Sequence, residues 1–153
     1  AFLPWPEALK AELDLRSGRV DAAADQLEHA WALATHLGDP CWEGMAARGL
    51  GLLSAARGDR PGATAWLTEA HTRCNRTTDR YQWVSAHVLD AVVGLAIDHA
   101  EEDEATRLAD ALFSLAARGD MRELVVRAQI HRSRLGDPSA LATARILAER
   151  KQC

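Results

Sequence analysis

A repeated helical pattern places the strongest restriction on the fold of this chain. Residues 18–23 align with residues 58–63, since each stretch starts with glycine and ends with alanine. Each stretch leads into an apolar stripe whose members recur every three or four positions, as on one face of an α-helix. A third stripe begins at Ala105, and a fourth follows Gly136. The copies recur after about 36–42 residues, a period typical of a repeat built from two helices.

Capping residues mark the ends of the predicted helices. Asp39-Pro40 and Asp137-Pro138 each place an N-cap side chain before a proline at the first helical position, where a missing N–H costs nothing. Glycine caps with positive φ are expected where helices should end, at Gly18, Gly38, Gly58, Gly119 and Gly136. Together these signals predict about eight helices, at residues 6–17, 20–37, 40–57, 60–75, 80–99, 102–118, 121–135 and 138–151.

Composition agrees with an all-α fold. Phe and Tyr number only 2 and 1, whereas Ala and Leu dominate the apolar residues, so few segments have the β-branched or aromatic richness of strands. We therefore predict a single all-α domain over residues 1–153, a right-handed α-solenoid of about four antiparallel helix pairs. The chain starts without Met and ends in the polar residues 149–153, and we expect it to be a fragment of a larger protein.

Charge and hydropathy narrow the possible partners. The formal net charge of −4 argues against nucleic-acid binding by this domain, because such binding depends on clustered basic residues. No apolar run approaches the roughly 20 residues that a membrane helix needs, so no membrane interaction is expected. Cys41, Cys74 and Cys153 form an odd set without metal-binding spacing, which favours reduced thiols in the cytoplasm.

The sequence offers no motif for catalysis. It contains neither a phosphate-binding loop of the GxxxxGK[ST] type nor a GxSxG nucleophile elbow. His71 and Cys74 lie three positions apart, as metal ligands can, but structural zinc needs four ligands and no companion pair is present. We therefore predict a protein that is not an enzyme and has no cofactor and no metal site.

Binding is expected on the first helix of each pair, because these helices line the concave face of an α-solenoid. The repeat spacing assigns the following residues to this predicted groove: Arg48, Trp83, His87, Asp90, Arg127, His131 and Arg134. Such a mixture of aromatic, His, Arg and Asp side chains suits a peptide, a protein partner or a small-molecule effector. The alternative is that His87 with Asp90, and Arg127 with His131, are ordinary surface pairs along a helix.

Two further expectations concern single residues. Replacing the groove residue Arg48 by Ala is predicted to weaken binding and to leave stability nearly unchanged. The apolar residues 2–6, which include Trp5, are predicted to cover the first end of the solenoid or to pair two copies of the chain.

A family resemblance rests on small and apolar residues at fixed offsets. In the second pair these are Gly51, Ala63, Leu67 and Ala70, and in the first pair they are Ala11, Ala23, Leu27 and Ala30. They resemble the tetratricopeptide pattern, in which small residues let two helix axes approach closely. Asp14 and Ser54 stand where the consensus has Tyr, and the repeat is about 40 rather than about 34 residues long. The chain therefore resembles a divergent variant with longer helices.

This variant is similar to the C-terminal sensor region of large bacterial regulators. They are the LuxR-type ATP-dependent activators related to the maltose regulator and antibiotic regulators of the Streptomyces type, and residues 37–40, 42–48 and 56–59 carry the likeness. The resemblance implies a sensor domain of an actinobacterial transcriptional regulator, with nucleotide-binding and DNA-binding modules elsewhere in the parent protein. The alternative function is a general scaffold for protein–protein interaction.

Overall fold

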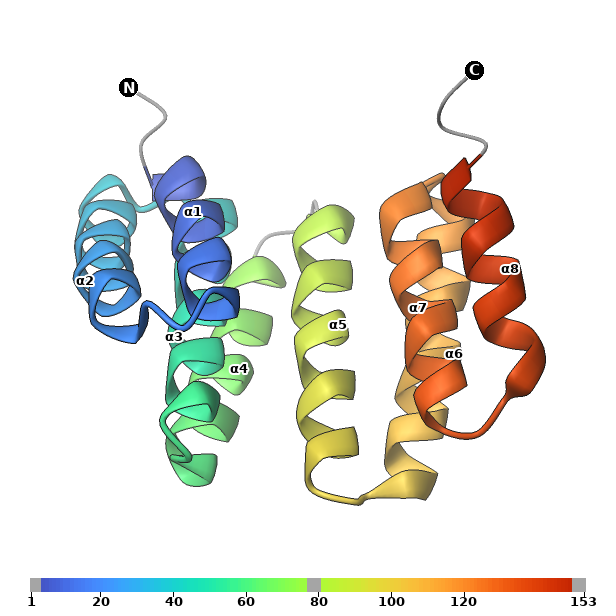
Figure 1. Cartoon of the computed structure of the whole chain (residues 1–153). Helices are drawn as coiled ribbons and strands as arrows, with labels where there is room; N and C mark the ends of the chain where they lie inside the picture. Colours follow the sequence, from blue (N-terminus) through green and yellow to red (C-terminus); the bar gives the residue numbers. More distant parts are fainter. Residues whose placement is uncertain (1–3, 77–80, 150–153) are drawn as a thin grey trace. The chain divides into compact units, whose positions relative to one another are not determined.

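All regular elements that the structure describes are α-helices. The computed structural model describes residues 4–76 and 81–149 (Figure 1). Its helices are α1 (Pro4–Arg16), α2 (Val20–Leu37), α3 (Pro40–Ala56), α4 (Arg60–Cys74), α5 (Gln82–Asp98), α6 (Glu102–Arg118), α7 (Arg122–Arg134) and α8 (Pro138–Glu149). The predicted all-α class and its eight helices are confirmed for this part of the chain. The predicted helical residues 80 and 150–151, and Phe2 and Leu3 of the apolar segment, lie outside it.

Local capping explains why the predicted bounds agree with the observed ones. The Asp39 carboxylate accepts hydrogen bonds from the backbone N–H groups of Cys41 and Trp42, at 2.8 and 3.2 Å, and so fixes the start of α3. Gly38 ends α2 with a φ of 68°, which glycine adopts without strain. The prediction for Gly119 is wrong, because Gly119 has a φ of −90° and the next residue, Asp120, takes the positive φ of 49°. Aspartate tolerates this conformation better than most residues.

The chain divides into two compact units, residues 1–88 (unit 1) and 89–153 (unit 2), with the division inside α5. In unit 1, α1 packs against α2, and α3 packs against α1, α2 and α4. The α3–α4 contact is close because Gly51 has no side chain: a Cβ there would lie 2.9 Å from Cγ of Leu67 and 3.4 Å from the carbonyl oxygen of Ala63. The core between the first three helices consists of Ala8, Ala11, Ala23, Ala24, Leu27, Leu50 and Leu53.

In unit 2, α7 packs against both α6 and α8. Leu112 of α6 and Leu124 of α7 are fully buried, together with a series of alanines at helical spacing. Alanine at these positions allows the helix axes to approach, as the repeat pattern predicted. Among the helices of both units that the structure describes, none combines the length and the apolar character that crossing a membrane requires.

Asp14 organises the turn between α1 and α2. Its carboxylate accepts hydrogen bonds from Nε2 of Gln26 at 2.8 Å, from Nε of Arg19 at 3.0 Å and from Nζ of Lys10 at 3.3 Å. These donors, Gln26 foremost and then Arg19, lower the pKa of Asp14 from 3.8 to about 2. A polar cluster around the Asp14 carboxylate therefore connects α1 to the start of α2.

This depressed pKa predicts a contribution of Asp14 to acid stability. The contribution is fully present above pH 3.8, the ordinary pKa of the group, and is lost as the pH falls through about 2, the pKa in the folded protein. Urea unfolding at a series of pH values should therefore show a smaller acid-dependent loss of stability in Asp14→Asn than in the parent chain. Asp25→Asn, at an exposed position of α2, serves as the control. If stability falls with decreasing pH as steeply in Asp14→Asn as in the parent chain, this role of Asp14 is contradicted.

Candidate functional site

The residues of the predicted groove all lie on odd-numbered helices and fall into two groups. Arg48 on α3 belongs to unit 1, as do Trp83 and His87 in the first half of α5. Unit 2 holds the remaining four, which are Asp90, Arg127, His131 and Arg134.

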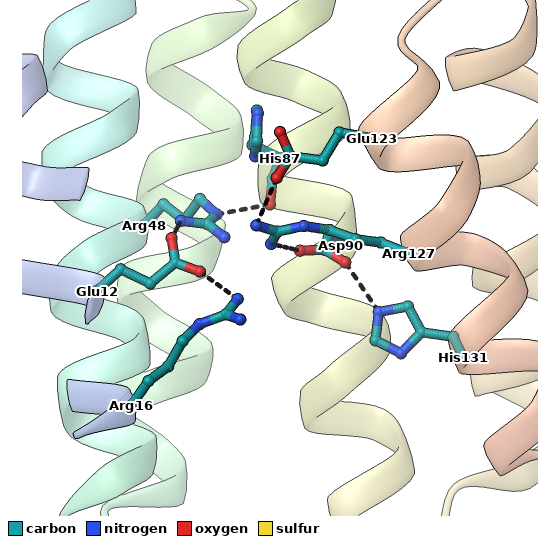
Figure 2. Close-up of polar contacts among 8 residues, drawn as sticks. All are labelled: Glu12, Arg16, Arg48, His87, Asp90, Glu123, Arg127 and His131. Atoms are coloured by element: carbon teal, nitrogen blue, oxygen red, sulfur yellow. Dashed lines mark hydrogen bonds and ion pairs between the residues drawn. The ribbon is translucent and has the colours of Figure 1, made fainter. Parts of the chain in front are cut away.

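In unit 1, Arg48 connects three helices. It is 2% exposed, its Nε donates to the carbonyl oxygen of His87 at 2.7 Å, and its Nη1 donates to Oε2 of Glu12 at 2.8 Å (Figure 2). The other oxygen of Glu12 accepts from Nη2 of Arg16, on the same helix, at 2.7 Å. The Glu12–Arg48 ion pair thus joins α1 to α3, and the bond to the His87 carbonyl joins α3 to α5.

This geometry corrects the expectation for Arg48. A guanidinium that is buried and paired cannot be truncated without leaving the Glu12 carboxylate short of a partner in a poorly solvated place. The burial and pairing of Arg48 therefore replace the expectation of nearly unchanged stability with that of a large loss in Arg48→Ala. Periodicity assigned Arg48 to the predicted groove, but it could not show that Glu12, 36 positions earlier, forms an ion pair with it.

Trp83 and His87 belong to a row of rings in unit 1. The ring centroids of Trp83 and Trp5 are 4.4 Å apart, and those of Trp83 and His87 are 4.0 Å apart. His87 itself is buried, whereas Trp5 and Trp83 are half-buried. Trp5 of the predicted end-covering segment therefore packs against α5, and the Trp5–Trp83 pair presents partly exposed aromatic surface.

In unit 2, Asp90 is the centre of a charged cluster. Its Oδ2 accepts from Nη1 of Arg127 at 2.8 Å, and its Oδ1 lies 2.9 Å from Nε2 of His131 (Figure 2). Nη2 of Arg127 donates to Oε1 of Glu123 at 2.9 Å. The side chains of Asp90 and His131 are 9% and 12% exposed, so these contacts lie largely out of solvent. The structure thus brings Asp90 of α5 together with Arg127 and His131 of α7. This arrangement is compatible with a ligand-binding role and with a structural one.

The contact with Asp90 indicates which tautomer His131 adopts. A carboxylate is an acceptor, so Nε2 of His131 carries the proton that it shares with Asp90. Nδ1 of the same ring is buried and has no hydrogen-bond partner within the described part of the chain. A ring protonated on Nε2 alone avoids placing an N–H group at this unpartnered position.

Arg134 lies one turn further along α7 and pairs with a residue that sequence reasoning missed. Its Nη2 donates to Oδ1 of Asp98 at 2.7 Å, and both side chains are well exposed, at 45% and 63%. Asp98 lies eight positions after Asp90, with Gly94 midway, so all three share one face of α5. This spacing of four was visible in the sequence, as was the spacing of four between Glu123 and Arg127, whereas the role of Glu12 depends on a tertiary contact.

Two observations concern metal ligands and cysteine thiols among the described residues. No group of three or more His, Cys, Asp or Glu side chains in residues 4–76 and 81–149 is placed to hold a metal ion. Desolvation by burial raises the pKa of Cys41 to about 11 and also raises the pKa of Cys74. Both thiols therefore stay protonated at neutral pH, the form in which cysteine is a poor nucleophile.

Comparison with known proteins gave no match to any protein-family model, curated protein or solved structure.

Proposed function

We propose that this chain is a non-catalytic binding domain that senses an effector for a bacterial transcriptional regulator of the LuxR type. The observation that carries the proposal is the row of polar side chains on α7, Arg127, His131 and Arg134, which contact Asp90 and Asp98 on α5. A polar ligand can replace one partner of an ion pair between two helices, and the Asp98–Arg134 pair is open to solvent. The tetratricopeptide-like pattern of the sequence supports the regulator assignment.

The proposed mechanism is conformational. The ion pairs between α5 and α7 hold the two helices in one relative arrangement. A ligand that replaces a partner in these pairs favours a different arrangement of the helices. An effector shifts such an equilibrium only through the difference between its affinities for the two states. In the cytoplasm, the shift would be transmitted to the nucleotide-binding and DNA-binding modules proposed for the parent protein.

A second candidate function is a scaffold that docks a protein or a peptide. The half-buried Trp5–Trp83 pair of unit 1 favours it, because tryptophan is enriched among the residues that contribute most to protein–protein binding. A partner's helix or extended segment could pack on these rings.

A thermal-shift screen with metabolites separates the two functions. A ligand at 100 times its Kd stabilises the fold by about 2.7 kcal/mol, which raises the melting temperature by several degrees. Stabilisation by a metabolite would support sensing. A flat metabolite screen, together with a peptide pull-down that Trp83→Ala abolishes, would support the scaffold instead. The regulator assignment would be wrong if the parent reading frame encoded neither a nucleotide-binding nor a DNA-binding segment.

A further inference from the structure

Two buried thiols lie at the same end of the α3–α4 hairpin in unit 1. Cys41 is in the first turn of α3 and Cys74 is the last residue of α4, whereas the turn that joins the two helices lies at their other ends. Cys41 is 9% exposed and Cys74 is fully buried. Both cysteines are free, and neither belongs to the binding sites proposed above.

The packing of α3 on α4 shows how the two helices are aligned. A Cβ built at Gly51 would lie 3.4 Å from the carbonyl oxygen of Ala63. At Gly44, seven residues earlier in α3, a Cβ would lie 3.4 Å from the carbonyl oxygen of Ala70, seven residues later in α4. The two helices therefore run antiparallel and keep one register over two turns. The same Cβ at Gly44 would lie 3.3 Å from Cβ of Cys74.

This register places Cys41 at the level of Cys74. Cys41 lies three residues before Gly44, a distance of about 4.5 Å along the helix, and therefore faces the last turn of α4. Besides desolvation, which is the main cause, the charge of a Cys74 thiolate contributes to the raised pKa of Cys41, as expected for neighbouring sulfurs. A disulfide needs Cα atoms about 4.4–6.8 Å apart, and two helices in contact through glycine allow this spacing.

We propose that Cys41 and Cys74 form a reversible disulfide that fastens α3 to α4 when the chain is exposed to a small-molecule disulfide such as oxidised glutathione. The disulfide would close the hairpin at the end opposite its turn. This inference goes beyond effector binding, because it requires neither a ligand nor the polar residues of α5 and α7.

The reaction consists of two exchange steps. The thiolate of Cys41, the more exposed of the two residues, attacks the small-molecule disulfide, forms a mixed disulfide and expels one thiolate, which takes up the proton that Cys41 lost. The thiolate of Cys74 then attacks the sulfur of Cys41, and the second small thiol leaves with the proton of Cys74. Two protein thiols are thus oxidised, while one disulfide is reduced to two thiols.

Burial makes this exchange slow. Both thiols are protonated and shielded in the closed fold, so each step requires the helix ends to open. Terminal turns open at a much lower free energy than the core does. In forming the disulfide, Cys74 gives up weak sulfur contacts of 3.4 Å with Oγ of Ser85 and with the carbonyl oxygen of His71. Exchange is therefore expected over minutes to hours.

The test uses the 153-residue chain with Cys153→Ser, which removes the third thiol of the sequence. The chain is equilibrated at a series of ratios of reduced to oxidised glutathione, its remaining thiols are alkylated, and its intact mass is measured. We expect a monomer that is lighter by two hydrogen atoms and accepts no alkylating group, with peptide mapping that places the cross-link between Cys41 and Cys74. Its melting temperature should exceed that of the reduced chain by about 5 °C or more, because the cross-link restricts the unfolded chain. Dithiothreitol should restore both thiols and the lower melting temperature.

Cys41→Ser in the same background is the matched control, since it keeps a side chain of similar size and removes one sulfur. It should gain at most one glutathione and show no rise in melting temperature under oxidising conditions. The proposal is overturned if two alkylated thiols remain at the most oxidising ratio, or if mixed disulfides or cross-linked dimers accumulate instead. It is also overturned if the intrachain disulfide forms without raising the melting temperature. The chain that keeps both cysteines supplies these readouts, so the test does not depend on the folding of the control.

Discussion

Replacing Arg48 by Ala is expected to lower the free energy of unfolding by about 3–5 kcal/mol, the usual cost of breaking a buried ion pair from one side. The Glu12 carboxylate would keep its contact with Arg16 but lose the buried guanidinium, and the His87 carbonyl would lose a donor at 2.7 Å. Urea denaturation followed by circular dichroism measures the difference. The loss should far exceed that of Arg118→Ala, at an exposed position of α6.

A double variant distinguishes the loss of pairing from the loss of packing. Arg48→Met combined with Glu12→Leu removes both charges and keeps similar volumes, and such replacements are often neutral or stabilising. We expect the double variant to recover most of the stability that Arg48→Ala loses. If Arg48→Ala lowers the free energy of unfolding by less than about 1 kcal/mol, the Glu12–Arg48 pair behaves like a surface ion pair. That result would contradict the buried connection between α1, α3 and α5.

Gly51→Leu is expected to destabilise the fold by more than about 2 kcal/mol through overpacking between α3 and α4. Even a Cβ would lie 2.9 Å from Cγ of Leu67 and 3.4 Å from the Ala63 carbonyl oxygen, and the latter belongs to backbone that cannot move alone. Melting temperature and urea denaturation both report the effect. Gly51→Ala should also destabilise the fold, but by a smaller amount, because alanine adds only the Cβ and none of the further side-chain atoms of leucine.

Gly94→Ala is the control for this variant, since it changes a helical glycine that has open space beside it. The added Cβ would meet only Cε1 of His131 at 3.9 Å, an ordinary contact. Alanine is also favoured over glycine within a helix by about 0.5–1 kcal/mol, so Gly94→Ala should be neutral or stabilising. Equal melting temperatures for Gly51→Leu and the parent chain would mean that the α3–α4 register is wrong.

Several features followed from local sequence alone. The start of α3 depends on Asp39 and Pro40, and the end of α2 depends on Gly38, so caps within a few residues set these bounds. The spacing of apolar residues likewise identified the buried side of α2 and of α4, because 3.6 residues per turn relate sequence directly to a helix face. Gly119 was an exception, since its neighbour Asp120 took over the positive φ.

The candidate site was only partly accessible to such reasoning. Periodicity grouped Arg127, His131 and Arg134 on one face of α7, and the structure pairs them with Asp90 and Asp98 of α5. Which predicted residues are buried could not be inferred, because burial depends on side chains from distant parts of the chain. Arg48 illustrates this: its partner Glu12 belongs to another helix pair, and no spacing rule connects positions 12 and 48.

Helix positions, their caps and their apolar faces were thus readable from the order of the residues, because backbone hydrogen bonding and helical periodicity act over a few neighbours. The partners of Arg48 and Asp90, the close approach at Gly51 and the open space at Gly94 arose from packing. Whether an ion pair is structural or available to a ligand depends on how much solvent the surrounding helices exclude, which is a property of the packed helices together.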